Sequence, residues 1–400
     1  MSYGLDLTLF DRESHNPSFF SLTRGMAGAR SEPVDFCVPC NPYFPTKTMF
    51  AQYASSLERI LKHYPSDNEV LGRRLAETLG LSSENIVLAN GSTELITWID
   101  ALLVRSSLAT PVPTFGRWTD QSAESGKQVH HYQLRPETGF RLDPEDFARF
   151  VKAHGAKAAV ICNPNNPDGG YLSQAAMLGL IDQLGDLDVV IVDESFIDFV
   201  DAEANPSVGT EILGRENTIV LKSLGKNFGL HGVRFGYALA HSRLAARLRR
   251  ALPPWNLNAM AESIIFSLQE HMGDYHESLK RIARDRRYMR DQLKRLPGAI
   301  VYPSQANFFL IKLPEGLDSV ACRNSLLTEH GVFIRECGNK IGMGGGYLRL
   351  AVRQPEEVDR LIAGLIEFSA SAPAQPAQTA RESWGRHSFQ TLAMASSPTH

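Results

Sequence analysis

Two residues whose side chains could take part in catalysis each follow a short apolar run. Asp193 follows its run directly, and Lys226 comes a few residues after another. Arg234 comes eight residues after the lysine, and two polar segments, NGSTE at residues 90–94 and CNPNNPDG at residues 162–169, also follow apolar runs. An amine and a carboxylate can move protons, while hydroxyls at a helix start and a guanidinium can bind an anionic group. The order and spacing of these segments predict one catalytic site.

The apolar runs are typical of buried strands in a largely parallel sheet, since they are short, rich in apolar and β-branched residues and bounded by Gly, Asn or Asp. They occupy residues 86–88, 158–161, 189–192 and 218–221. Apolar residues from Leu95 to Leu103 repeat with helical spacing, and Ser92 or Thr93 is placed to cap that helix. We therefore expect a doubly wound α/β domain, with the polar segments at the ends of its strands.

The pattern along the chain predicts four parts. Residues 1–45 form a proline-rich, irregular arm on the substrate side, and residues 46–255 form the large domain. Residues 256–368 change to long charged helices followed by strands, which predicts a smaller C-terminal α+β domain. Residues 369–400 are rich in Ala, Pro, Ser and Gln, so we expect this tail to be disordered.

Within the smaller domain the sequence predicts one long helix and two strands. The helix covers residues 271–296, and the strands include residues 301–302 and 308–311. The glycine-rich run at 342–346 follows no strand-to-helix pattern, so it is either a flexible turn or a mobile cover near Arg349.

Composition excludes several function classes. The net charge is −3, and the arginine-rich segments interleave with acidic residues, which argues against a nucleic-acid surface. No apolar run approaches the length of a membrane span, and the first residues do not have the pattern of a signal peptide. The histidines show no metal-ligand spacing, and CVPC at residues 37–40 lacks the context of a redox motif. We expect a cytoplasmic enzyme without a metal site.

Taken together, the motifs resemble those of the fold-type-I enzymes that use pyridoxal 5′-phosphate (PLP). The resemblance runs from about Asn41 to Ile366, within the class I/II aminotransferase superfamily. It is closest to the branch of histidinol-phosphate aminotransferase and threonine-phosphate decarboxylase. It implies the PLP-dependent transferase fold: a large doubly wound, mixed and mostly parallel sheet domain plus a smaller C-terminal α+β domain.

The resemblance assigns roles around the ring of the cofactor, which acts as an electron sink. Lys226 matches the lysine that forms the Schiff base and then moves the α-proton. Asp193 matches the partner of the pyridinium nitrogen, and Asn166 matches the donor to the ring oxygen. Phe115 matches the aromatic residue that stacks on the ring, although a core position would also suit an aromatic residue.

The resemblance also implies a phosphate site and a homodimer. Ser92 and Thr93 at a helix start, the Ser223 hydroxyl and the Arg234 guanidinium match the residues that bind the cofactor phosphate. Tyr64 matches a tyrosine that reaches the phosphate of the neighbouring subunit's cofactor, so the two subunits would share their active sites.

Four positions match the substrate side of the family's site. Arg349 matches the arginine that binds the α-carboxylate, and Arg335 matches a second anion-binding arginine of this branch. Asn41 and Asn307 match residues that line the substrate site. The expected ligand is a small, amino-acid-like molecule, and whether it is phosphorylated stays open.

Three functions remain. The first is a PLP-dependent aminotransferase that forms a keto acid. The second is a decarboxylase, another lyase or a carbon–carbon bond-forming enzyme, favoured by three departures from the aminotransferase pattern: Phe196 where a tyrosine is usual, Trp255 and Arg353. The third is a non-catalytic PLP-fold domain, which the retained lysine makes the weakest of the three.

Overall fold

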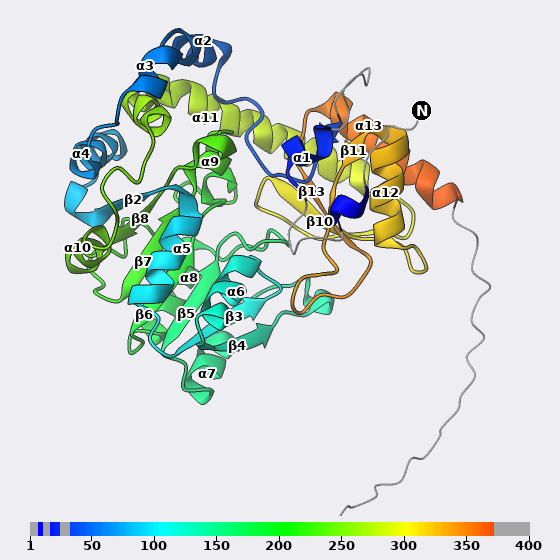
Figure 1. Ribbon diagram of the computed structural model, residues 1–400. Helices are drawn as coiled ribbons and strands as arrows, with labels where there is room; N and C mark the ends of the chain where they lie inside the picture. The colour runs from blue at the N-terminus through cyan, green and yellow to red at the C-terminus, as the bar shows by residue number, and fades with distance from the viewer. Residues whose placement is uncertain (1–6, 11–16, 25–32, 372–400) are drawn as a thin grey trace, which may run out of the picture.

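The protein folds into two domains that lie side by side and share one long helix (Figure 1). This computed structural model describes residues 7–10, 17–24 and 33–371. The tail expected to be disordered therefore lies outside the described residues from position 372 onward, and the final helix extends to Ser371.

A seven-stranded sheet forms the centre of the large domain, in the order β2-β8-β7-β6-β5-β3-β4. All its neighbouring strands are parallel except the pairs that β8 makes with β2 and β7. The strands are β2 (Ile86–Ala89), β3 (Ser107–Val112), β4 (Gln128–Gln133), β5 (Ala158–Cys162), β6 (Val189–Asp193), β7 (Thr218–Lys222) and β8 (Gly236–Ala240).

The four apolar runs of the sequence are strands β2, β5, β6 and β7, as predicted. They are buried along almost their whole length because helices cover both faces of the sheet (Figure 1). The helices of this domain are α2 (Lys47–Ser55), α3 (Leu57–Lys62), α4 (Asn68–Leu79), α5 (Gly91–Leu102), α6 (Gly116–Glu124), α7 (Pro144–Ala153), α8 (Gln174–Gln183), α9 (Leu224–Asn227) and α10 (Ser242–Arg249).

The start of α5 differs from the prediction that Ser92 or Thr93 caps it. The helix begins at Gly91 and its N-cap residue is Asn90, whose side chain makes no capping hydrogen bond. The backbone N–H of Asn90 instead donates to Glu94 Oε2 at 2.6 Å. Because neither hydroxyl caps the helix, both are left for a ligand at its N-terminus.

The small domain is built on a four-stranded antiparallel sheet in the order β12-β13-β10-β9. Helices α12 (Ser319–His330) and α13 (Pro355–Ser371) pack together beside it (Figure 1). The strands are β9 (Ile300–Val301), β10 (Phe308–Lys312), β12 (Arg335–Glu336) and β13 (Tyr347–Ala351).

The long helix α11 spans Ala259–Leu293 and so begins twelve residues before the predicted 271–296 and ends earlier. The prediction missed its first turns, which Asn258 caps by accepting a hydrogen bond from the N–H of Ala261 at 3.0 Å. Leu268 belongs to the core of the large domain, whereas Met289 belongs to the core of the small one. The predicted division at 255/256 therefore falls just before a helix that both cores share.

The N-terminal arm contains short ordered elements rather than only irregular chain. Strand β1 (Val34–Asp35) pairs in parallel with β11 (Val332–Phe333) of the small domain, and α1 covers Phe19–Thr23. Phe36 is buried in the small-domain core. In the described part of the chain, no helix has the length and apolar composition to cross a membrane.

Candidate active site

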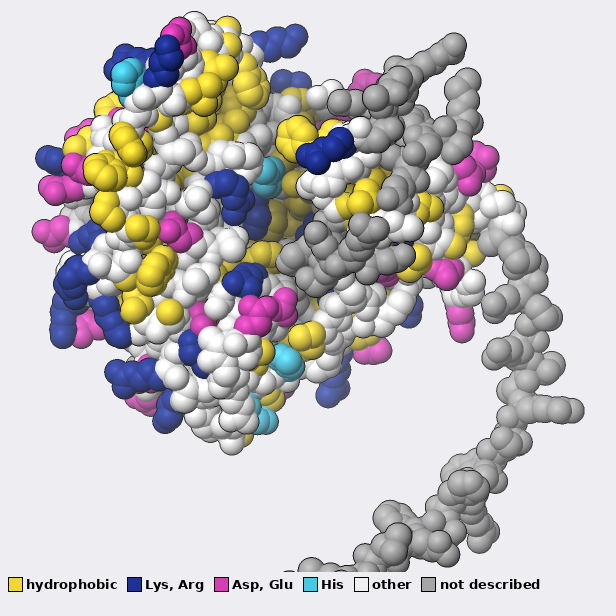
Figure 2. Space-filling model, in the orientation of Figure 1, with side chains coloured by type: hydrophobic (Ala, Val, Ile, Leu, Met, Phe, Trp, Pro, Cys, Tyr) yellow, Lys and Arg dark blue, Asp and Glu magenta, His cyan; other side chains and the backbone are white. Residues whose placement is uncertain are grey.

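A cavity of about 380 Å³ lies between the two domains, where the surface is hollowed in Figure 2. Five of the predicted site residues line it: Phe115, Asn166, Lys226, Arg335 and Arg349. A larger cavity of about 610 Å³ lies beside residues 162–172, and none of the predicted site residues lines it.

Lys226 is on the short helix α9, and its amine faces two aromatic rings. Nζ lies 4.3 Å from the ring centre of Phe196 and 5.3 Å from that of Phe115. Burial lowers the pKa of Lys226, and the positive charges of Arg349 and Arg234 lower it further, although Asp193 opposes the shift. The lowered pKa favours the neutral amine, which is the nucleophilic form.

Asp193 ends strand β6 and is buried. Its carboxylate accepts a hydrogen bond from Trp118 Nε1 at 2.8 Å and another from the backbone N–H of Ser195 at 3.0 Å. These two donors hold the carboxylate in one orientation at the strand end, close enough to Lys226 to affect the pKa of its amine.

Arg349 connects three segments at the cavity wall. Its Nη1 donates to Asn166 Oδ1 at 2.7 Å and its Nη2 donates to the carbonyl of Cys37 at 2.7 Å. Its Nε is buried and, among the described residues, has no hydrogen-bond partner. The guanidinium is therefore oriented by protein groups and keeps donor capacity for a ligand.

The structure brings Arg234 to the N-terminus of α5, where the sequence predicts a phosphate site. Arg234 Nη2 lies 3.4 Å from the Thr93 hydroxyl, and a Cβ atom on Gly91 would come within 2.7 Å of that same nitrogen. Gly91 also has a positive φ of 78°, so glycine suits this close approach on both counts. Ser92 and Ser223 lie buried nearby on α5 and at the start of α9.

Two arginines and a lysine form the small-domain wall of the cavity. Arg335 and Arg349 lie directly opposite each other on the antiparallel strands β12 and β13. Lys340, in the loop between these strands, also lines the cavity. Burial lowers the pKa of Lys340 to about 8, and Arg349 and Arg335 contribute to the shift. The sequence interpretation noted this loop but not its lysine.

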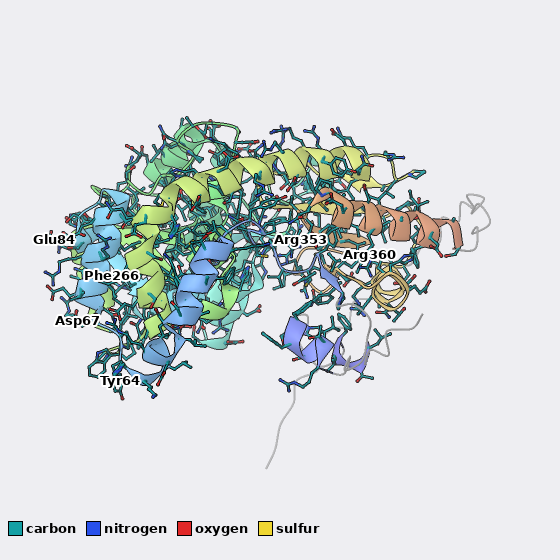
Figure 3. The ribbon with its side chains drawn as sticks, turned by 90° about the horizontal axis from the view of Figure 1, so that it is seen from above. Tyr64, Asp67, Glu84, Phe266, Arg353 and Arg360 are labelled. Carbon is teal, nitrogen blue, oxygen red and sulfur yellow. The ribbon has the colours of Figure 1, made fainter. Side chains whose placement is uncertain are left out.

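Tyr64 does not approach the cavity within one chain. Its side chain is 83% exposed and packs on Trp255, with ring centres 5.3 Å apart. Figure 3 shows Tyr64 at the far end of the large domain, well separated from Arg353. A role of Tyr64 at the cofactor of a neighbouring subunit stays a prediction.

Asn41 and Asn307 are buried and, in the described structure, do not line the cavity. Asn41 Nδ2 donates to the carbonyl of Asn227 and to the Ser278 hydroxyl, so it ties the N-terminal arm to α9 and α11. Both side-chain polar atoms of Asn307 have no hydrogen-bond partner among the described residues. Arg353 donates to the carbonyls of Asp35 and Val38, and thus holds the N-terminal arm against the small domain.

Several residues that line the cavity or orient Asp193 gave no signal in the sequence. Trp118 orients Asp193, and Cys37, Val38 and Pro39 line the cavity although the CVPC segment has no redox context. His231 lines it as well, and burial together with Lys226 lowers its pKa to about 4, so it is neutral at pH 7. The only sequence hint for these residues was that an N-terminal arm and a glycine-rich turn flank the predicted site.

The donor set fits PLP. At the start of α5, the helix N-terminus, the Thr93 hydroxyl and the Arg234 guanidinium could bind a phosphate. Asp193 offers an oriented carboxylate for a ring nitrogen. A lysine amine with a lowered pKa lies between them, next to Phe115. Individual roles of these residues remain predictions.

Comparisons with known proteins agree with this fit. An L-serine phosphate decarboxylase of Campylobacter jejuni is 30% identical over 367 residues, which is 88% of this chain and 93% of that protein. A histidinol-phosphate aminotransferase of Pyrococcus furiosus is 30% identical over 330 residues, 82% of this chain and 90% of that protein. The solved structure of a decarboxylase from Sulfurospirillum multivorans matches with a TM-score of 0.80 at 30% identity, covering 89% of this chain and 92% of the other.

Residues 46–365 match the aminotransferase class I and II family. The predicted fold class and cofactor are thereby confirmed, and the fold agrees with that of the decarboxylase from S. multivorans. The chain belongs to the aminotransferase class I and II family, and it is a PLP-dependent enzyme of fold type I.

Proposed function

We propose that the enzyme decarboxylates a phosphorylated amino acid such as O-phospho-L-serine. One observation carries this proposal: Arg335, Lys340 and Arg349 bring three cations to one wall of the cavity, while Asp120 is the only carboxylate among the described residues that line it. A phosphate ester carries about −1.5 to −2 charges at pH 7, and the α-carboxylate adds another. Three cations match that ligand better than an amino acid with one carboxylate.

The relatives support the same reaction. The two sequence relatives and the solved structure named above are proteins described as L-serine phosphate decarboxylase, histidinol-phosphate aminotransferase and decarboxylase. Aminotransferase activity, the first sequence interpretation, is thus supported only at the level of the superfamily. The second interpretation, decarboxylation, fits the relatives better.

In this mechanism Lys226 holds PLP and later acts as a proton donor. PLP, when bound, supplies the electron sink for the reaction. Asp193, fixed by Trp118, keeps a proton at the pyridine nitrogen, and Asn166 donates to the ring oxygen. Arg349 binds the α-carboxylate and orients it. With PLP bound, the Cα–carboxylate bond would break and CO₂ would leave. The Lys226 ammonium would deliver a proton to Cα, where the electron pair of the broken bond would form the new C–H bond of the phosphorylated amine.

A homodimer completes this proposal. Tyr64 packs on the exposed Trp255, and Leu57 and Leu61 on helix α3 are exposed as well. Exposed apolar side chains of this kind suit contact with a second copy better than contact with water. Arg234 and Thr93, at the predicted phosphate site, are exposed in the single chain, which leaves room for a tyrosine from that second copy. Light scattering should therefore give a mass of twice 44.3 kDa, and a monomer would contradict shared sites.

The test measures CO₂ release from phosphorylated amino acids and amino-group transfer from L-histidinol phosphate. The holoenzyme should release CO₂ from O-phospho-L-serine without any keto-acid acceptor, and its Schiff-base absorption band should persist through many turnovers. Transfer of the amino group from L-histidinol phosphate to 2-oxoglutarate, with no CO₂ from O-phospho-L-serine or O-phospho-L-threonine, would instead establish an aminotransferase.

A further inference from the structure

The loop at residues 337–346 crosses from the small domain to the large one and fixes Lys340 at the cavity wall. Lys340 Nζ donates to the carbonyl of Thr114 at 2.7 Å. Two residues later, the carbonyl of Gly342 accepts from Gln133 Nε2 at 2.9 Å. Gly342 has a φ of 78°, and a Cβ there would come within 2.7 Å of the Gln133 side chain, so the close contact requires glycine.

The Lys340 ammonium has unused donors in this position. An ammonium has three N–H groups, and the carbonyl of Thr114 takes one. In the described structure, no carboxylate forms an ion pair with Lys340 and no second acceptor contacts Nζ. A half-buried cation of this kind next to Arg335 and Arg349 is unfavourable unless an anion joins it.

We propose that Lys340 binds the phosphate group of the substrate and thereby sets the preference for a phosphorylated amino acid. Arg335 acts with it at the same anion, while Arg349, oriented by Asn166, binds the α-carboxylate. This inference rests on the proposed function, and it adds the residue that distinguishes the phosphorylated substrate from its unphosphorylated analogue.

Position supports this division of labour. Arg349 contacts Asn166, which lies on the large-domain side of the cavity where Lys226 also lies. Lys340 lies on the loop beyond Arg335, so it can reach the distal end of a short substrate. A site built around a half-buried ammonium discriminates against an analogue that lacks the anion, because the ammonium would then have no anionic partner.

Binding should depend on pH in a defined way. The groups that act on Lys340 are Arg335 and Arg349 on the paired strands, Cys337 on its own loop and Cys162 at the end of β5. Burial raises the pKa of Asp168 to about 6, and Lys340 slightly opposes that shift. Together with burial, the two arginines and two cysteines leave the pKa of Lys340 at about 8.

Lys340 is therefore charged at pH 7 and loses its charge as the pH rises through about 8. Affinity for a phosphorylated substrate should fall in that range. It should also fall below about pH 6, where a phosphate ester takes up its second proton.

Two variants and one control test the inference on the holoenzyme. At pH 7 the Lys340→Met enzyme should show a KM for O-phospho-L-serine that is raised at least about tenfold, because one charge-assisted hydrogen bond is lost. Its kcat, and its kcat/KM for L-serine, should stay near the values of the unmodified enzyme. Lys312→Met is the matched control: Lys312 packs over Tyr347 in the same domain, outside the cavity, and its KM should not change.

The Lys340→Arg variant tests whether the pH dependence of KM comes from the loss of charge at residue 340. An arginine stays charged across the measured range, so this variant should keep a low KM and should lose the rise in KM above pH 8. Equal changes in kcat and KM for both substrates in Lys340→Met would overturn the inference, because Lys340 would then serve only to tie the loop to Thr114.

A binding measurement keeps this inference separate from the proposed function. Calorimetric titration of the holoenzyme with inorganic phosphate should give weaker binding for Lys340→Met than for the unmodified protein and for Lys312→Met. Failure to release CO₂ from any phosphorylated amino acid would overturn the proposed function alone. Equal phosphate affinity in all three proteins would overturn the role of Lys340.

Discussion

The two walls of the cavity use charge in opposite ways. On the large-domain side two buried charged groups have protein partners: Asp193 accepts two hydrogen bonds, and Lys222 lies 2.9 Å from Glu194. On the small-domain wall, neither Lys340 nor Arg349 forms an ion pair with a carboxylate among the described residues, although both line the cavity.

This difference suggests that one side of the cavity controls the reaction rate and the other controls substrate affinity. Charges that protein groups already neutralise cannot contribute much to ligand binding, but they fix the atoms that react. Cations that lack a carboxylate gain most when an anionic ligand arrives. Changes on the large-domain side should therefore affect kcat or stability, and changes on the small-domain wall should affect KM.

The largest effect is expected from Lys226→Ala. Loss of the amine removes both the attachment of the cofactor and the proton donor, so kcat for CO₂ release should fall by at least about a thousandfold. The pKa of Lys226 is lowered in the fold, which means that its charged form destabilises the apoprotein below that pKa. The variant apoprotein should therefore melt no lower at pH 7, and an active Lys226→Ala enzyme would contradict the assignment.

The next effect is on stability and comes from Lys222→Met. Burial alone would lower the pKa of Lys222, but the carboxylates of Glu194 and Asp198 raise it above the usual value. Removing the amine leaves Glu194 buried without its partner, so the free energy of unfolding in urea should fall by about 3–5 kcal/mol. Adding Glu194→Gln should restore part of this loss.

The pH dependence gives a check on that variant. A lysine whose pKa is raised in the fold contributes stability that is complete below the unfolded pKa of about 10.4 and is lost only above it. The difference between Lys222→Met and the unmodified protein should therefore be constant from pH 6 to 9. A difference that shrinks within this range would show that another group is responsible.

The sequence located residues at strand ends more readily than residues that long-range packing brings to the site. Lys226 and Asp193 follow buried strands, and strand ends of a parallel sheet meet at one edge, so their neighbourhood follows from local pattern. Lys340 and Trp118 carry no such signal. Lys340 reaches the cavity only because its loop crosses to Thr114, a contact between residues 226 positions apart.

Long-range packing also explains the misplaced start of α11. The predicted start at residue 271 follows the charged, amphipathic part of the helix. The actual first turns contain Ile264 and Ile265, which are buried in the core of the large domain. Burial by a separate domain is a tertiary property, and it extends the helix to residues that its amphipathic pattern did not include.

Among Lys226→Ala, Lys222→Met and Arg349→Lys, the smallest effect is expected from Arg349→Lys. This variant keeps the positive charge on the small-domain wall but loses the forked arrangement of donors. An arginine can contact Asn166 and the carbonyl of Cys37 with separate nitrogens at 2.7 Å each, whereas a single ammonium cannot reproduce this fork. Loss of one charge-assisted contact of about 1.5–3 kcal/mol should raise the KM for O-phospho-L-serine by roughly 10- to 100-fold.

Arg353→Lys is the matched control for this comparison. Arg353 lies four residues later, does not line the cavity in the described structure and donates to the carbonyls of Asp35 and Val38, so its replacement should lower the melting temperature more than it raises KM. If Arg349→Lys lowered kcat and left KM unchanged, Arg349 would act with the large-domain wall through Asn166. The division between the two walls would then lie between Arg349 and Arg335, although these residues are directly opposite each other on paired strands.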